Sequence, residues 1–102
     1  MFDEDVPRQL RRDLPGFIIR TVQEQSWSSL KNGELLRTAA REFDVLLTAD
    51  KNLQYQQNIP QFDIGVVVLA SVDTRLSSLQ TLLPEIRTAI AGVAPGTVVR
   101  VP

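Results

Sequence analysis

Two apolar runs of strand length, 44–50 (DVLLTAD) and 64–71 (IGVVVLAS), constrain the fold of this chain more than any other feature. Neither run alternates regularly between apolar and polar residues, as a strand with one solvated face does. Strands buried on both faces have this continuous apolar character, and they are typical of parallel sheets covered by helices. The two runs therefore predict the centre of a parallel sheet.

Strand-like and helix-like segments alternate along the rest of the chain. Further strands are predicted just before Asp3, over 17–22 (FIIRTV) and over 97–101 (TVVRV). Helices are predicted within 6–16, over 33–43 and over 75–92, and a long loop with one helical turn over 51–63. Pro84 must either kink the last helix or begin a second one. This order predicts one three-layer α/β domain over 1–102, with a mainly parallel sheet of about five strands and helices on both faces.

The composition excludes several kinds of chemistry. The chain has no His and no Cys, so it has no Ser-His or Cys-His nucleophile and no thiolate or imidazole metal site. The net charge of −1 gives no overall attraction to nucleic acid, so such binding requires a local patch. Carboxylates remain as metal ligands, and they suit hard cations such as Mg²⁺ or Mn²⁺.

No apolar run reaches the roughly 18 residues of a membrane-spanning helix. The first residues, MFDEDVPRQL, are acidic and lack the apolar centre of a signal peptide. We therefore expect a cytoplasmic protein with no membrane partner.

Acidic residues follow two of the predicted strands. Asp3 and Asp5 leave the first strand, and Asp50 leaves the strand over 44–50. Ligand sites in open parallel sheets lie outside the carboxyl ends of the strands, so these carboxylates are expected to meet there. Glu34, at the start of the preceding helix, reaches the same place if the loop before it folds back. A divalent metal would neutralise such a group and activate a bound water.

Each of these residues also has an ordinary structural explanation. Asp50 suits a turn, Glu34 is favoured by the helix dipole, and an acid after a strand can cap a helix. Trp27 and Tyr55 are either packing residues or platforms on which a base stacks. Thr48 is a candidate for holding the strand end or for hydrogen-bonding a carboxylate, and Asn52 is a candidate for the metal shell or for substrate contact. Lys51 is a candidate for a phosphate contact. Three further residues form either a solvated helix face or phosphate contacts: Arg8, Arg11 and Arg12.

Three segments in order, FDEDVPRQL, NGELLRTAA and DVLLTADKNL, resemble the PIN-like domains of bacterial toxin-type nucleases. The resemblance covers nearly the whole chain. It implies a metal-dependent endoribonuclease that uses Mg²⁺ or Mn²⁺ to hydrolyse RNA phosphodiesters. It also implies the toxin role in a toxin–antitoxin pair, with an antitoxin protein and a second copy of the chain as possible partners. Asp3 matches the acid of the first strand and Asp50 that of the Thr-x-Asp motif, while Glu34 is the candidate third ligand or base.

This sequence departs from the family pattern at three places. Asn32 stands where a central acid is usual, Asn52 stands where a further acid is common, and Met1 leaves the first strand short. These departures favour an alternative, a PIN-like binding module without cleavage that acts through protein or RNA partners. A phosphoacceptor receiver domain is a third alternative, but it requires a Lys at the end of the last strand, where this chain has Arg100.

Overall fold

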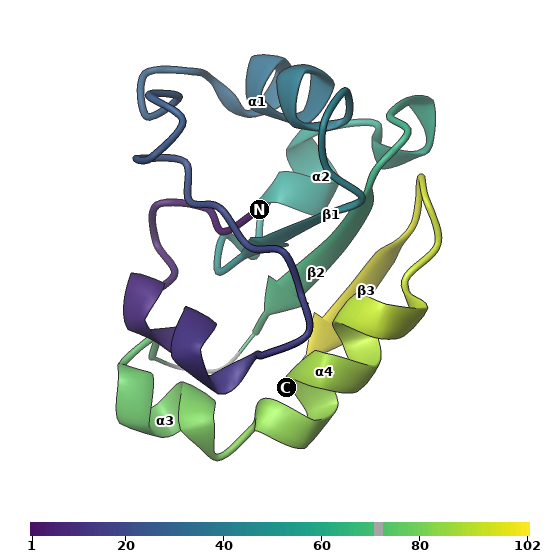
Figure 1. Ribbon diagram of the computed structural model, residues 1–102. Coiled ribbons are helices and arrows are strands. Elements are labelled where there is room, and N and C mark those ends of the chain that lie inside the picture. The colour runs from purple at the N-terminus through teal and green to yellow at the C-terminus, as the bar shows by residue number, and fades with distance from the viewer. Residues whose placement is uncertain (71–72) are drawn as a thin grey trace.

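The computed structural model describes residues 1–70 and 73–102. The sheet has three strands, β1 (Val45–Thr48), β2 (Gly65–Leu69) and β3 (Val98–Val101), in the order β1-β2-β3 and all parallel. The helical elements are η1 (Arg8–Asp13), α1 (Asn32–Ala39), α2 (Leu53–Gln56), η2 (Ile59–Gln61), α3 (Leu76–Gln80) and α4 (Leu83–Gly92). Figure 1 shows α1 and α2 on one side of the sheet and α3 and α4 on the other.

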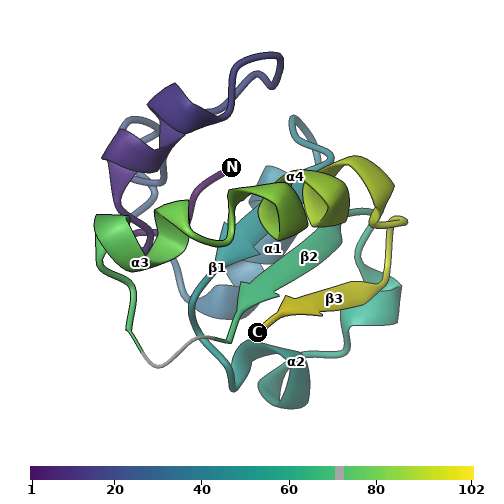
Figure 2. The same ribbon diagram turned by 90° about the horizontal axis from the view of Figure 1, so that it is seen from below.

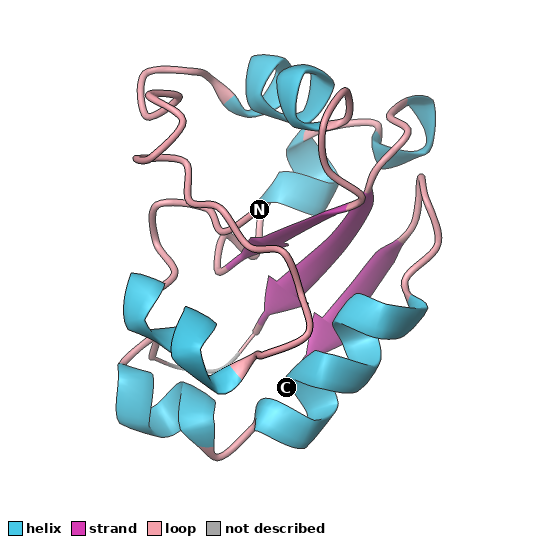
Figure 3. Cartoon of the chain, in the orientation of Figure 1, coloured by secondary structure: helices cyan, strands magenta, loops and turns pink. Residues whose placement is uncertain are grey.

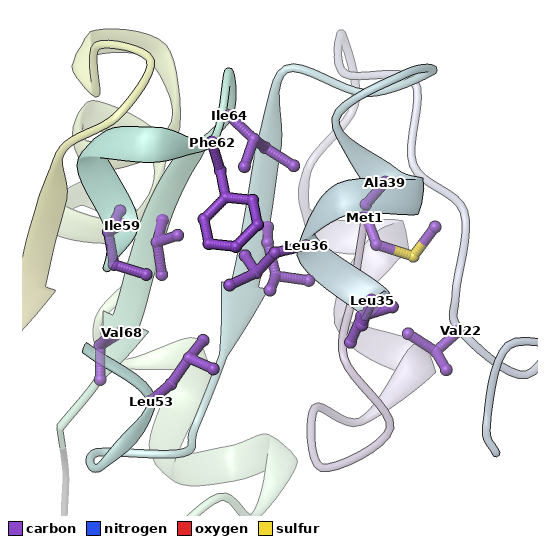
Figure 4. Close-up of a cluster of buried hydrophobic side chains, with 12 residues drawn as sticks. Met1, Val22, Leu35, Leu36, Ala39, Leu53, Ile59, Phe62, Ile64 and Val68 are labelled. Atoms are coloured by element: carbon purple, nitrogen blue, oxygen red, sulfur yellow. The ribbon is translucent and has the colours of Figure 1, made fainter. Parts of the chain in front are cut away.

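Alternate residues of the strands build two separate apolar cores. Leu46, Val66 and Val68 face α1 and α2, together with Leu36 and Phe62. Figure 4 shows this core between α1 and the sheet. Leu47, Val67 and Leu69 point to the other face, where the core residues of the helices are Leu10, Leu79 and Ile86. Because the side chains of a strand alternate between faces, continuous apolar runs fill both cores. The predicted α/β class, parallel sheet and helices on both faces are confirmed.

The described residues form three strands instead of the five expected, because two of the expected strands are reduced to isolated bridges. Phe2 pairs with Leu47 of β1 on one side and with Thr21 on the other, both in parallel. The chain turns at Glu4 and Asp5 directly afterwards, so this segment offers one residue for pairing. The expected strand over 17–22 therefore has almost nothing to pair with, and Ile18 remains 85% exposed.

The helices follow the predicted pattern with local differences. The first helix is a 3-10 helix of six residues rather than an α-helix. Pro84 begins a second helix, since it occupies the first turn of α4, where its missing N–H needs no partner. The predicted end of the 64–71 strand at Ser71 lies outside the described residues. Figure 3 shows how much of the first thirty residues is loop.

Within the described ranges, no helix is both long and apolar enough to cross a lipid bilayer.

Candidate functional site

Asp3 is held at the carboxyl end of β1 by the segment that lies beside that strand. The Asp3 N–H donates to the Leu47 carbonyl, which places Asp3 level with the end of the strand. The Thr48 hydroxyl donates to Asp3 Oδ2 at 2.7 Å, and the Glu4 N–H donates to Oδ1 at 2.8 Å. Thr48 is fully buried and Asp3 is 9% exposed. The predicted role of Thr48 in bonding a carboxylate is thus present in the structure.

Asp5 reaches back to the same strand end from the turn that follows Asp3. Its Oδ1 accepts a hydrogen bond from the Ala49 N–H at 3.1 Å. Although the residue lies at the surface, its carboxyl is partly withdrawn from water, and this desolvation raises its pKa to about 6. The Ala49 N–H opposes the increase, and the negative charges of Asp3 and Asp50 add to it. Asp5 therefore lies in the field of both other carboxylates.

Asp50 is held by a turn that links β1 to α2. Its N–H donates to the Thr48 hydroxyl at 3.1 Å, so one buried hydroxyl bonds both Asp3 and the Asp50 backbone. The Asn52 N–H donates to Asp50 Oδ1 at 3.0 Å, as an acidic residue commonly arranges in a turn. The Asn32 side chain, at the start of α1, donates to Asp50 Oδ2 at 3.3 Å. Asp50 was expected to be either a turn residue or a site residue. In the structure it has both positions, because its hydrogen bonds shape the turn and it lies near Asp3 and Asp5.

The three carboxylates are neighbours, but they are not arranged as a complete set of metal ligands. Among the residues that the structure describes, no three acidic side chains surround a common point as ligands of an ion do. Each carboxylate accepts hydrogen bonds from the protein, and each oxygen keeps a further lone pair. Carboxylate oxygens are suitable ligands for Mg²⁺ and Mn²⁺. A bound cation would also relieve the repulsion by Asp3 and Asp50 that adds to the effect of desolvation on the pKa of Asp5.

Glu34 does not join this group through any contact. It lies exposed in the first turn of α1, and within residues 1–70 and 73–102 no side chain or N–H bonds to its carboxylate. It is also missing from the charges that raise the pKa of Asp5. Asn32, two residues earlier, contacts Asp50 in its place.

The predicted basic residues have different surroundings. Arg11 donates to the Glu24 carboxylate at 2.7 Å and to the Ile19 carbonyl at 3.3 Å, and this bond holds the pKa of Glu24 below its usual value. Arg11 therefore ties η1 to the loop after it. Arg8, Arg12 and Lys51 are exposed and available to solvent or a ligand.

The two aromatic residues with open roles are also distinguished by the structure. Trp27 packs edge-on against Phe43, with ring centroids 6.2 Å apart, and covers the α1-side core. Tyr55 is 74% exposed on α2, and its hydroxyl accepts a hydrogen bond from Arg100 at 3.3 Å. Sequence reasoning missed the pairing of Tyr55 with Arg100 and the contact of Asn32 with Asp50. A signal for the first was available, since α2 begins shortly after the carboxyl end of β1 and Arg100 lies near the carboxyl end of a parallel strand.

The chain matches no protein-family model, and comparisons with curated proteins and with solved structures give no match. The resemblance to PIN-like domains therefore remains a prediction that rests on the residues of this chain.

Proposed function

We propose that this chain is a metal-dependent endoribonuclease whose metal ligands are Asp3, Asp5 and Asp50. The observation that carries the proposal is that hydrogen bonds hold all three acids at the carboxyl end of β1. The Thr48 hydroxyl bonds Asp3 and the Asp50 N–H, and Asp5 accepts a hydrogen bond from the Ala49 N–H. Chemistry in open parallel sheets is commonly located at this edge. From the resemblance alone, we extend the proposal to the toxin role in a toxin–antitoxin pair.

The donor set fits Mg²⁺ or Mn²⁺, because it consists of hard oxygen ligands and carries an excess of negative charge. When bound, such an ion lowers the pKa of a coordinated water and stabilises charge on a phosphate. Thr48 and the Asn52 N–H hold Asp3 and Asp50 in place by hydrogen bonds. We assign the third carboxylate to Asp5 rather than Glu34, because Asp5 accepts a hydrogen bond from the Ala49 N–H next to Asp50, whereas none of the described residues bonds the Glu34 carboxylate.

The exposed cations near this edge are candidates for holding the RNA backbone. Arg8 and Arg12 lie on η1, which begins three residues after Asp5, and Lys51 follows Asp50 directly. Arg11 is not assigned this role, because Glu24 occupies its guanidinium. With a net charge of −1, the protein depends on such local cations to attract phosphates.

The proposal is tested by titrating Mn²⁺ into the protein and into Asp50→Asn near neutral pH, with the heat followed by calorimetry. We expect binding in the micromolar to low-millimolar range, weakened at least about tenfold in Asp50→Asn. Asp63→Asn, an exposed acid just before β2, is the matched control and should bind as the unmodified protein does. Metal-dependent cleavage of single-stranded RNA should follow the same ranking. Absence of Mn²⁺ binding in the unmodified protein would overturn the proposal.

One observation favours the second candidate, a binding module without cleavage. The Asn32 amide donates to Asp50 where another carboxylate would add charge, so it offsets part of the repulsion without an ion. This candidate predicts RNA or protein binding that is unchanged by Mn²⁺ or by EDTA.

A further inference from the structure

The sheet register places Arg100 in the same row as the acidic site. Thr48 is aligned with Val68, and Val68 is aligned with Arg100. Neighbouring strands lie about 4.8 Å apart, so the Cα atoms of Thr48 and Arg100 are separated by about 10 Å. Val98, two residues before Arg100, packs against the core under α1 and α2, so Arg100 belongs to that same face. Arg100 is exposed and lies two strands from Thr48, at the same carboxyl edge of the sheet as the acidic site.

The Tyr55 side chain lies on the surface next to the Arg100 guanidinium. α2 begins immediately after Asn52, whose N–H bonds Asp50, so the helix starts at the acidic site and leads away from it. The Tyr55 hydroxyl meets Arg100 at 3.3 Å, while 74% of the residue remains exposed. Figure 2 shows α2 below the end of β3, on the opposite side of the sheet from α4.

An exposed aromatic ring beside a guanidinium has the chemistry to bind a nucleotide. Bases of any identity stack on aromatic rings, and Arg pairs with phosphate through charge-assisted hydrogen bonds. Lys51 is exposed and lies between Asp50 and α2 in the chain. It adds a second positive charge between the acidic site and the Tyr55–Arg100 pair. Without a metal, the acidic site repels phosphate, so a substrate strand requires attraction from neighbouring groups such as these.

We propose that Tyr55 and Arg100 form a nucleotide subsite for single-stranded RNA, in which a base stacks on the Tyr55 ring and a phosphate pairs with Arg100. The strand would run from this subsite past Lys51 to the acidic site. The inference rests on the proposed function, since it takes RNA as the ligand.

The test measures the affinity of a short labelled oligouridine by fluorescence anisotropy at low salt in EDTA, so that binding is separated from cleavage. We expect Tyr55→Ala and Arg100→Ala each to weaken binding about tenfold. Tyr55→Phe keeps the ring and should bind within about twofold of the unmodified protein. Arg41→Ala, an exposed Arg before β1 at the other end of the sheet, is the matched control and should also leave affinity unchanged.

A purely structural role, in which the hydroxyl ties α2 to β3, gives a different pattern. Tyr55→Phe and Tyr55→Ala would then lower the midpoint of thermal unfolding together, with RNA affinity unchanged in both, and this result would overturn the subsite. Absence of oligouridine binding by the unmodified protein would also overturn it. Loss of affinity in Tyr55→Ala, together with no Mn²⁺ binding, would support the subsite while overturning the nuclease proposal. If the unmodified protein binds Mn²⁺ and cleaves RNA, but Tyr55→Ala leaves the affinity for oligouridine unchanged, the nuclease proposal would be supported and the subsite overturned.

Discussion

The two ends of the parallel sheet are built from different interactions. At the carboxyl end, β1 stops at a buried hydroxyl, and directional hydrogen bonds hold Asp3, Asp5 and Asp50. At the amino end, the chain leaves a cavity of about 540 Å³ with apolar side chains such as Phe17, Phe43 and Val93 in its walls. Apolar contacts do not specify direction, whereas each hydrogen bond does. The comparison therefore predicts that small chemical changes matter at the carboxyl end and changes of shape matter at the amino end.

The largest effect is expected for Thr48→Val, which keeps the shape of the side chain and removes its hydroxyl. Asp3 then loses its 2.7 Å bond in a buried setting, and the Asp50 N–H loses its acceptor. We expect the free energy of unfolding to fall by about 2–3 kcal/mol, measured by urea denaturation. Thr38→Val is the control, because the part of the chain described here offers its hydroxyl no hydrogen bond. Equal losses in the two variants would contradict the contrast between the ends.

A smaller effect is expected for Gly65→Ala at the amino end, where shape should decide. The added Cβ would lie 2.7 Å from Val93 Cγ1 and 3.2 Å from the Ala94 carbonyl oxygen, so the neighbouring segment must shift. We expect a loss of about 1–2 kcal/mol in the free energy of unfolding. Gly92→Ala is the matched control, because a Cβ there meets nothing within 4 Å and Ala favours the helix. If both variants keep full stability, the amino end tolerates shape changes and the comparison fails.

The smallest effect concerns the ionisation of Asp5. Its pKa is raised from 3.8 to about 6, so between these values the folded protein keeps a proton that the unfolded chain has released. The free energy of unfolding should therefore fall as pH rises through this window and stay at the lower level above it. The change is expected to be below about 1 kcal/mol, because the residue is exposed and water screens its charge.

Urea denaturation in EDTA at about pH 4.5 and about pH 6.5, compared between the unmodified protein and Asp5→Asn, isolates this difference. The comparison is required because burial lowers the pKa of the N-terminal amine from 8.0 to about 6, and this change opposes the effect of Asp5. Asp5→Asn should remove it, whereas Asp63→Asn at the amino end should leave it intact. An unchanged pH dependence in Asp5→Asn would show that the Asp5 carboxyl is not withdrawn from water as the structure places it.

The two central strands of the sheet could be predicted from the sequence, but the strands expected at the edge of the sheet beyond β1 were not formed. Continuous apolar runs identified β1 and β2, since only strands covered on both faces use such runs. The segment over 17–22 has strand-like residues, yet its partner offers only Phe2 for pairing. β-propensity describes how a residue fits a sheet, and it cannot supply a neighbouring strand.

For the candidate site, residue types and spacing determined that acids would leave two strand ends, because parallel strands bring their carboxyl ends to one edge. Tertiary structure alone decided which acids are neighbours. Asp5 reaches Ala49 because the chain turns at Glu4, and Asn32 rather than Glu34 meets Asp50 because of how α1 lies on the sheet. The pairing of Tyr55 with Arg100, 45 positions apart in the chain, likewise depends on where α2 lies relative to β3. Local pattern specifies periodicity and strand ends, whereas contacts between distant segments depend on the packing of whole elements against one another.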